Sequence, residues 1–472
     1  MATGFKQTIT QSGSTLASLK KQRSYNEVVE FLDTHWRPTS QKVDLAVVKA
    51  LDTLFNNPSQ KIAAVTIAGS NGKSLTAHFT SQLFYNEGLK VGSLSTPHIN
   101  LYNERITFNN ETINNKLFTE YVNEVINAVE TATLKVYSEE ILLIAALNYF
   151  IAQEVDVVLL EAREGAASDV TAICSPKVLA ITRVTGKTVN EFGVAQEDTL
   201  RELLTVSPKK THIISADQNK TNLKTMEVWA SNNDCVWEMP VRKLAPLKYP
   251  FEQLHGRCAA LAERIVSIFV NECMETHDEK FVQESLLAKK KGQRGRPTLA
   301  AKSEREKNPT KTIEHFWKEA ENKLSSKFEL LEKEKTTILL DNAYNEDSLK
   351  NFLLGIRLHH YQRPIKGLVL VIACNEDEVN LESFSKQIRY FFKKTTSGSV
   401  IVCGFKSQPG QKQAWDYEAA NEELKNVKVK SRTATSLKEA LEHAKKNITD
   451  RHGLIAISGP ISLIKEFWDL KK

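Results

Sequence analysis

The chain lacks the features that would place it in a membrane or cross-link it covalently. Its 472 residues include no apolar run of membrane-spanning length, and the opening stretch MATGFKQTITQSGS has no apolar signal core. The six cysteines lie far apart and form no C-x-x-C pair, which argues against a disulfide framework or a zinc site. With 41% hydrophobic residues, the composition is typical of a globular protein. The length of 472 residues predicts two domains. We therefore expect a cytoplasmic protein with reduced thiols.

The net charge of +6 has a local origin. Residues 289–311 contain nine basic and two acidic side chains, so the rest of the chain is close to neutral, and a whole-surface nucleic-acid binder is not supported. The polarity, Gly and Pro of this segment favour a solvated linker or surface insertion. Two alternatives stay open: Gly295-Arg296-Pro297 could contact a nucleic-acid groove, or the segment could be an ordered insertion near an active site. The basic residues are Lys289, Lys290, Lys291, Arg294, Arg296, Lys302, Arg305, Lys307 and Lys311.

One stretch has the pattern of a phosphate-binding loop. Apolar residues 65–67 predict a buried strand, GSNGKS follows at 69–74, and a helix is expected from Leu75 onward. In such a loop the backbone N–H groups and the helix dipole attract phosphate, Lys73 neutralises the outer phosphates and the Ser74 hydroxyl can ligate Mg²⁺. Ile67 stands where the usual pattern has its first glycine, and an ordinary strand-to-helix turn is the alternative. The predicted phosphate-binding residues are Gly69, Ser70, Asn71, Gly72, Lys73 and Ser74.

The first two thirds of the chain alternate between strand and helix patterns. Continuous apolar runs predict parallel strands, and helical spacing predicts the helices between them. This alternation predicts an α/β fold with a doubly wound, mostly parallel sheet. Ligands bind such a sheet beyond the carboxyl ends of its strands, where residues 69–74, 95–98 and Glu161 fall. The predicted strands are Val91–Leu94, Val155–Leu160, Val178–Thr182 and His212–Ser215, and the helical regions are Tyr25–Asn57, Ala77–Glu87, Asn114–Leu134, Ser138–Gln153 and Phe251–Asn271.

A second, smaller and Rossmann-like α/β unit is predicted from Thr312 onward. Its strands are expected at Ile338–Leu340, Leu368–Ala373, Ser399–Val402 and Leu454–Ile457, with a helix at Ala434–Lys445. The predicted organisation is an unstructured N-terminus at 1–24, a nucleotide-binding domain at 25–288, the basic insertion at 289–311 and a C-terminal domain at 312–472.

Two sequence motifs have the same order and spacing as two motifs of one protein family. GSNGKS after VTIA resembles the P-loop of the Mur ligase superfamily. Farther on, Ser95-Thr96-Pro97-His98-Ile99 and Asn103-Glu104-Arg105-Ile106 are similar to the T-S-P-H-L…N-E-R-I substrate segment of its folylpolyglutamate synthase / dihydrofolate synthase branch. ILLDNAYNED at 338–347 resembles the branch's D-G-A-H-N-P motif, and GLIAISGPISL at 453–463 resembles its closing strand and helix. The resemblance covers roughly residues 25–467.

The resemblance implies an ATP-dependent ligase that joins a carboxylate to an amine. The acid would take the γ-phosphoryl group of ATP, and the amine of glutamate would attack the acyl phosphate, with positioning and charge stabilisation providing most of the catalysis. Lys73 would hold the β- and γ-phosphates, and Ser74, Ser95 and Glu161 would bind Mg²⁺. Glu161 ends the apolar strand VDVVLLE, and a solvent-exposed strand-end carboxylate is the alternative. Together with Lys73 and Glu161, His98 is a predicted catalytic residue, with a packed structural histidine as the alternative.

The resemblance also assigns further site residues. Glu140 matches a helix motif of the family, and we interpret that helix as structural first. After Glu161, the family's glycine, aspartate and threonine are matched by Gly165, Asp169 and Thr171. The additional nucleotide-binding residues are His255, Lys327 and Asp341, and the substrate-binding residues are Ser95, Thr96, Pro97, His98, Arg105, Tyr344 and Asn345.

Several positions depart from the family pattern. Lys187 and Thr188 stand where the family has the Asp and His of I-T-x-I-G-x-D-H, and Leu203 stands at its carbamylated lysine, so one metal site is lost. Lys187 could replace the second Mg²⁺ with a fixed ammonium, or the loss could mark decay of activity. Ala259 replaces the asparagine that reads the base. The other departures are Ala166 and Ala167 for a glycine and an arginine, Tyr344 for a histidine, and Ser325-Ser326-Lys327 for P-G-R.

Three functions therefore stay open. The favoured one is an ATP-dependent ligase of the folylpolyglutamate/dihydrofolate synthase type, in folate biosynthesis and one-carbon metabolism, or a relative acting on another acid. A nucleotide-binding pseudoenzyme is favoured by Leu203, Thr188 and Ala259. A nucleic-acid-associated ATPase would use residues 289–311 and bind in a salt-dependent way. The expected partners are ATP, glutamate and a folate-type acid, and the expected cofactor is Mg²⁺. We expect no binding to a membrane or to nucleic acid. The chain is expected to be a monomer.

Overall fold

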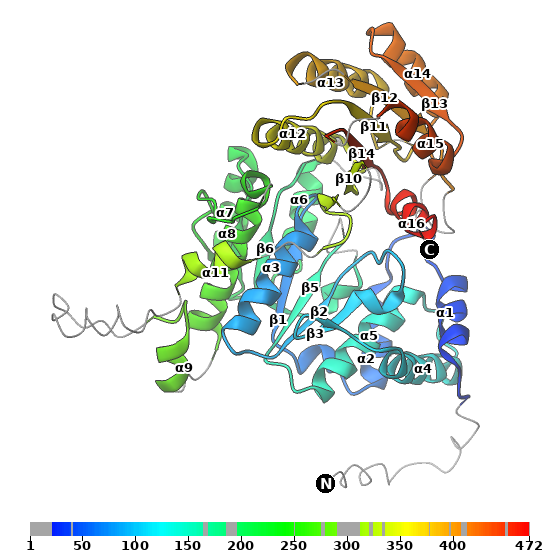
Figure 1. The fold of residues 1–472 in the computed structure, drawn as a ribbon. Coiled ribbons are helices and arrows are strands. Elements are labelled where there is room, and N and C mark those ends of the chain that lie inside the picture. The colour runs from blue at the N-terminus through cyan, green and yellow to red at the C-terminus, as the bar shows by residue number, and fades with distance from the viewer. Residues whose placement is uncertain are drawn as a thin grey trace, which may run out of the picture.

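Two α/β units, each built on its own sheet, make up the chain (Figure 1). The computed structural model describes residues 21–38, 41–163, 169–185, 196–249, 251–274, 279–289, 312–320, 324–332, 336–376, 378–395, 398–406, 413–448 and 452–471. Within these ranges no helix combines the length and apolar character needed to cross a membrane. The fold class predicted from the alternation of strands and helices is confirmed.

The larger sheet has the strand order β4-β3-β2-β5-β1-β6-β7-β8. The six strands β2, β5, β1, β6, β7 and β8 run parallel to one another. Strands β3 and β4 extend the sheet in antiparallel pairing at the β2 edge. Every residue of β1, β2 and β5 is buried, as their continuous apolar runs predict for strands covered on both faces. The bounds are β1 Ala64–Ala68, β2 Val91–Leu94, β3 Ile106–Phe108, β4 Glu111–Thr112, β5 Val157–Glu161, β6 Pro176–Ile181, β7 His212–Ser215 and β8 Val236–Trp237.

Register brings the predicted site residues to one edge of this sheet. Ile67 at the end of β1 pairs with Glu161 at the end of β5, and Leu94 at the end of β2 pairs with Leu160. The loops that follow β1 and β2 therefore begin beside Glu161, as the predicted parallel topology requires.

Helices cover both faces of the larger sheet. One apolar cluster unites α3 and α8 with the sheet, and a second unites α1, α2, α4 and α5. The helices are α1 Tyr25–Thr34, α2 Leu45–Leu54, α3 Lys73–Asn86, α4 Asn115–Ala132, α5 Ser138–Ala152, α6 Gln196–Leu204, α7 Lys220–Asn232, α8 Glu252–Ile268, α9 Glu279–Glu284 and α11 Ile313–Glu319. Short turns are the 3₁₀ segments Pro58–Gln60, Tyr102–Arg105 and Val170–Ile173 and a π-helical turn at Phe269–Cys273.

Helix α11 shows that the predicted start of the C-terminal unit at Thr312 is too early. Phe316 and Trp317 are buried in the same apolar cluster as α3 and α8. The Trp317 ring packs edge-on against Phe79, and its Nε1 donates a hydrogen bond to Glu263 at 2.9 Å. Residues 312–320 therefore belong to the N-terminal unit, because their apolar side chains are buried there.

The predicted unstructured N-terminus, 1–24, also extends too far. Arg23 is buried and donates hydrogen bonds from its guanidinium to Asn123, Asn127 and Glu130 of α4, at 2.9, 2.8 and 2.6 Å. Ser24 caps α1. Residues 1–20, and residues 290–311 of the basic segment, lie outside the described residues.

The smaller sheet has the order β13-β12-β11-β14-β10-β9, parallel except for β9. The helix predicted from Ala434 begins later, because Ala434 ends β13 and Ser436 caps the helix. The strands are β9 Glu329–Leu331, β10 Thr337–Asp341, β11 Leu368–Ile372, β12 Gly398–Cys403, β13 Ser431–Ala434 and β14 Leu454–Ser458. The helices are α12 Glu346–Gln362, α13 Leu381–Lys394, α14 Tyr417–Asn426, α15 Leu437–Asn447 and α16 Ile461–Asp469.

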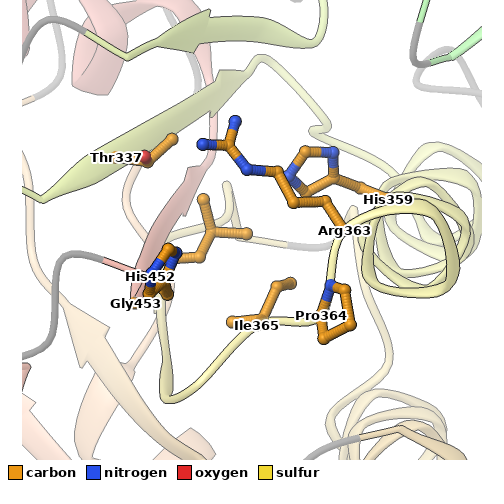
Figure 2. A pocket seen from close by; sticks show the side chains of 8 residues that line it. Thr337, His359, Arg363, Pro364, Ile365, His452 and Gly453 are labelled. Atoms are coloured by element: carbon orange, nitrogen blue, oxygen red, sulfur yellow. The ribbon is translucent and has the colours of Figure 1, made fainter.

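A small cavity lies at the amino ends of β10 and β14, where Thr337, His359, Arg363 and His452 surround it (Figure 2). Its volume of about 20 Å³ is enough for one water-sized molecule. Because Thr337 and Asp341 are the opposite ends of β10, this cavity is distinct from the predicted ligand site.

Candidate functional site

The P-loop depends on two glycines with left-handed backbone conformations. Gly69 has φ +127° and Gly72 has φ +90°, and Gly72 directly precedes α3. A Cβ atom at position 69 would lie 2.4 Å from Thr182 Oγ1 and 3.0 Å from the carbonyl oxygen of Arg183. That carbonyl accepts a hydrogen bond from the Ser70 N–H at 2.7 Å, so the loop lies directly against the segment after β6. Only glycine fits at position 69.

This packing predicts a large effect for Gly69→Ala. The added methyl meets both the left-handed strain and the contact with Thr182, so we expect about 2–3 kcal/mol of destabilisation by urea denaturation and loss of nucleotide binding. Gly88→Ala is the matched control, because Gly88 has φ +84° but an added methyl would have no atom within 4 Å, and it should cost only about 1 kcal/mol. Equal destabilisation by the two substitutions would show that contact with Thr182 is unimportant.

Lys73 lies folded over the loop that it follows. Its Nζ donates hydrogen bonds to the carbonyl oxygens of Gly69 at 2.7 Å and Ser70 at 3.3 Å. The ammonium is therefore held at the centre of the loop, where the outer phosphates of a nucleotide would be bound.

Glu161 and Ser74 form a pair of hard oxygen ligands beside Lys73. The Ser74 hydroxyl donates to Glu161 Oε1 at 2.8 Å, while Glu161 Oε2 is buried and has no hydrogen-bond partner among the described residues. Glu161 is only 5% exposed, which excludes the alternative of a solvent carboxylate. Burial raises the pKa of Glu161, although Lys73, the Ser74 hydroxyl, Lys327 and the backbone N–H of Thr96 favour its charged form. A buried carboxylate oxygen without a partner fits a cation ligand, and Mg²⁺ is commonly held by one or two carboxylates together with substrate phosphates.

Across the described ranges, no group of three or more His, Cys, Asp or Glu side chains gathers as a metal site. A cation at Ser74 and Glu161 would therefore depend on further oxygens from the substrate and water, as Mg²⁺ in nucleotide sites does.

The segment from Ser95 to Arg105 forms a closed loop beside β5. The Ser95 N–H donates to the Arg105 carbonyl at 2.8 Å, and the Glu104 carboxylate accepts from the backbone N–H groups of Ile99, Asn100 and Leu101 at 2.7 to 3.0 Å. Ser95 follows Leu94, the neighbour of Leu160, so it starts beside Glu161. Ser95 is thus placed where a shared cation ligand would lie.

His98 lies within this loop against Arg105. Arg105 Nε donates to His98 Nδ1 at 2.9 Å, and the ring packs on Tyr102 with centroids 4.3 Å apart. Burial, with Arg105 and Lys465 nearby, lowers the pKa of His98 to about 3. His98 is therefore uncharged at neutral pH.

The predicted nucleotide-binding residues of the two units meet around Lys327. Lys327 Nζ donates to Asn342 Oδ1 at 2.7 Å, and its charge acts on Glu161, His255 and Asp341. Burial and then Lys327 lower the pKa of His255 to about 4, and His255 Nδ1 lies 2.8 Å from the Tyr249 hydroxyl. Residues far apart in sequence are thus within electrostatic range of one ammonium group.

Asp341, at the carboxyl end of β10, has a pKa raised to about 6 by burial, against the opposing effects of Lys327 and the Phe328 N–H. The folded protein therefore disfavours the charged form of Asp341 more than the unfolded chain does. The free energy of unfolding that protonated Asp341 contributes in acid is lost as the pH rises from about 4 through 6. A difference of about two pH units corresponds to about 3 kcal/mol. We expect Asp341→Asn to remove this fall when urea denaturation is followed between pH 4 and 7. Parallel pH profiles for the two proteins would contradict the prediction.

The C-terminal unit also contacts the P-loop directly. Asn71 exchanges hydrogen bonds with Asn345 at 3.3 and 3.2 Å and donates to Asp347 at 2.9 Å. Arg183 pairs with the same Asp347 carboxylate at 3.0 Å. The Tyr344 hydroxyl donates to the carbonyl oxygen of Ser70 at 3.4 Å. The predicted substrate residues Tyr344 and Asn345 therefore lie over the P-loop.

Comparison with known proteins identifies the family to which this arrangement is similar. No family model matches the chain. A dihydrofolate synthase/folylpolyglutamate synthase of Bacillus subtilis is 24% identical over 322 residues, which are 66% of this chain and 71% of that protein. One of Haemophilus influenzae is 30% identical over 172 residues, which are 35% of this chain and 37% of that protein.

Solved structures cover nearly the whole chain. Mycobacterium tuberculosis folylpolyglutamate synthase complexed with ADP superimposes with a TM-score of 0.72 at 18% identity, over 94% of this chain and 98% of that one. A bifunctional folylpolyglutamate synthase/dihydrofolate synthase with Mn, AMPPNP and L-glutamate bound has a TM-score of 0.69 at 15% identity, over 95% and 98%. In sequence and in fold, the chain is similar to proteins of the folylpolyglutamate synthase/dihydrofolate synthase type.

The chain departs from the motifs of these similar proteins, and the structure shows what surrounds two of the altered positions. Leu203, at the position of the family's lysine, is 1% exposed and packs in an apolar cluster with Ala162, Val184 and Leu204. Ala259, at the position of the base-reading asparagine, is fully buried in the cluster of α3 and α8. Both positions are now core. Lys187, Thr188, Gly165, Ala166 and Ala167 lie outside the described residues.

Glu140 has a structural environment, as expected. It is buried, pairs with Arg37 and accepts a hydrogen bond from the Tyr137 N–H at 3.1 Å at the start of α5. Asp169, matched to the family motif, caps the following turn by accepting from the Thr171 N–H at 2.9 Å.

Sequence reasoning gave no role to two residues that join the units beside the P-loop. Arg183 and Asp347 bridge the two units through their ion pair. Arg183 follows strand β6, which is next to β1 and ends beside the P-loop. Because ligands bind beyond the carboxyl ends of parallel strands, this position could have indicated a residue of the site. Asp347 ends the ILLDNAYNED segment, whose resemblance placed Asn345 in the site but gave Asp347 no role.

Proposed function

We propose that the chain is an ATP-dependent ligase that adds glutamate to a folate-type acid through an acyl phosphate. The observation that carries the proposal is the buried Glu161 carboxylate beside Lys73, which accepts from the half-buried Ser74 hydroxyl and has one oxygen left for a cation. The family relationship supports it, since the related structures are described with ADP, or with Mn, AMPPNP and L-glutamate.

In this proposal each group has a defined task. The backbone of residues 69–74 and Lys73 bind the phosphates, and His255, Lys327 and Asp341 bind the rest of the nucleotide. Ser74, Ser95 and Glu161 would hold Mg²⁺, which when bound neutralises phosphate oxygens. Tyr344, Asn345 and the loop from Ser95 to Arg105 would hold the acid and the amino acid near the P-loop.

The reaction follows from that arrangement. A carboxylate oxygen of the acid attacks the γ-phosphorus, and ADP leaves with the bridging oxygen. The glutamate amine then attacks the acyl carbon, phosphate leaves, and the amine loses a proton to complete the amide. Since little covalent chemistry falls to the protein, holding the reactants in line is its main contribution.

The test is release of inorganic phosphate from ATP with Mg²⁺. We expect release only when both glutamate and a pteroate or folate acid are present, with amide product formed in equal amount. The proposal is overturned if no pairing of acid and amine stimulates release by well-folded protein.

A second candidate is a nucleotide-binding pseudoenzyme, which the apolar burial of Leu203 and Ala259 favours. It would bind Mg²⁺ and ATP at the same P-loop but release no phosphate with any acid. The phosphate assay, combined with a measurement of nucleotide affinity, separates the two candidates.

A further inference from the structure

Hydrogen bonds fix the segment that follows β6, which contains Arg183, against the P-loop. The Arg183 carbonyl accepts from the Ser70 N–H at 2.7 Å, and the Thr185 N–H donates to Ser70 Oγ at 3.1 Å. Between these two contacts, the Val184 N–H donates at 3.1 Å to Asp217, a residue that is only 2% exposed. The Arg183 side chain therefore starts from a backbone whose position relative to the P-loop is set.

The Arg183 guanidinium shares its carboxylate partner with the P-loop. It pairs with Asp347 Oδ1 at 3.0 Å, and Asp347 Oδ2 accepts from the Asn71 side-chain amide at 2.9 Å. The Arg183 side chain is 49% exposed, while that of Asp347 is 14% exposed. A guanidinium carries five N–H donors, and the pair with Asp347 occupies only part of them. Donors of Arg183 are therefore left, beside the P-loop, for a ligand.

A triphosphate in the P-loop meets charges of both signs. Lys73 attracts its oxygens, whereas the Asp347 carboxylate, bonded to Asn71, repels them unless it is neutralised. The Arg183 guanidinium neutralises Asp347, and its planar set of N–H donors matches the oxygens of a phosphate. During phosphoryl transfer negative charge spreads over three oxygens, and in some P-loop enzymes an arginine of the same chain stabilises that charge. The contacts of Arg183 therefore favour a role toward phosphate in addition to joining the units.

We propose that the Arg183 guanidinium donates hydrogen bonds to the γ-phosphate of the bound nucleotide, as a further catalytic residue, and that Asp347 is the residue that positions it. No proton moves in this contact, because arginine stays charged in proteins. The inference rests on the proposed function in that a triphosphate occupies the P-loop. It adds a contact that a diphosphate does not make, so Arg183 distinguishes the two nucleotides.

The test compares the affinities of the full chain for ADP and for the ATP analogue AMPPNP, both with Mg²⁺, by calorimetric titration. In Arg183→Met, the AMPPNP affinity should fall by at least about tenfold, because charge-assisted hydrogen bonds are lost, while the ADP affinity stays within about twofold. Arg183→Lys should give an AMPPNP affinity between those of the wild type and Arg183→Met, since it keeps the charge without the planar fork of donors. Asp347→Asn should lower the AMPPNP affinity by about threefold and leave the ADP affinity unchanged.

Arg264→Met is the matched control for Arg183→Met. Arg264 is 44% exposed and pairs at 2.8 Å with Glu238, which is 13% exposed, so the two ion pairs are alike in burial. Glu238 follows β8, which β6 and β7 separate from β1 and its P-loop. We therefore expect Arg264→Met to change neither nucleotide affinity.

Two results for Arg183→Met would overturn the inference: unchanged affinity for both nucleotides, or an equal loss of affinity for both, which would mean that Arg183 only supports the loop. An unchanged AMPPNP affinity in Asp347→Asn would overturn the positioning role of Asp347. A selective loss of AMPPNP affinity in Arg183→Met, without phosphate release by the wild type, would refute the ligase and keep the Arg183 contact. Phosphate release by the wild type without that selective loss would do the reverse.

Discussion

Lys73→Met is expected to abolish phosphate release, by at least about 10³-fold, because it removes the positive charge centred in the P-loop and keeps a chain of similar length. Lys73 Nζ also donates to the carbonyl oxygens of Gly69 and Ser70, so the loop loses two contacts. Nucleotide affinity should fall as well, since the ammonium contacts phosphate before and during transfer. Steady-state phosphate release and calorimetric ATP titration measure the two effects separately.

Lys438→Met is the control for Lys73→Met, since Lys438 is exposed on α15 and far from the loop in sequence. If Lys73→Met retained turnover within about tenfold, the ammonium would not stabilise the transferred phosphoryl group. If the wild type shows no turnover and Lys73→Met only lowers nucleotide affinity, the pseudoenzyme is the correct interpretation.

Glu161→Gln is expected to lower Mg²⁺-dependent turnover by about 10²-fold and to stabilise the nucleotide-free protein. The carboxylate is buried with one oxygen unpartnered among the described residues, and burial raises its pKa, so the folded state disfavours the charge. A neutral amide relieves this cost but is a poor ligand for Mg²⁺. Glutamine can still accept from Ser74. Phosphate release at several Mg²⁺ concentrations tests the expected loss of turnover. Urea denaturation without nucleotide tests the expected gain in stability.

Opposite signs for activity and stability distinguish a cation ligand from a structural carboxylate. Glu104→Gln is the matched control, because its carboxylate accepts three backbone N–H groups and its loss should destabilise the protein. A Glu161→Gln protein that is less stable, with unchanged Mg²⁺ dependence, would mean that Glu161 only supports the fold.

The strand edge of the site could be predicted from the sequence, because its signals are local. The apolar runs ending at Ile67 and at Leu160 predict neighbouring parallel strands, and the residues that follow them must meet at one edge. The structure confirms that register and places Lys73 beside Glu161. The P-loop helix begins at Lys73, two residues before the predicted Leu75, since the left-handed Gly72 precedes it directly.

The joins between the units could not be predicted, because they depend on contacts far apart in sequence. Trp317 belongs to the N-terminal unit since Phe79 and Glu263 offer it a ring contact and an acceptor there. Asn71 and Asp347 are 276 residues apart and meet only when both units are folded. Pattern and resemblance indicated His98 for the site, but its tautomer depends on where Arg105 places its guanidinium.

The most direct test of the central claim is calorimetric titration of the full chain with ATP, with and without Mg²⁺. If Lys73, Ser74 and Glu161 bind a magnesium triphosphate, binding should be saturable near one ATP per chain and should weaken by at least about tenfold when Mg²⁺ is withheld. Well-folded protein that takes up no ATP, or takes it up equally without Mg²⁺, would contradict both the ligase and the pseudoenzyme.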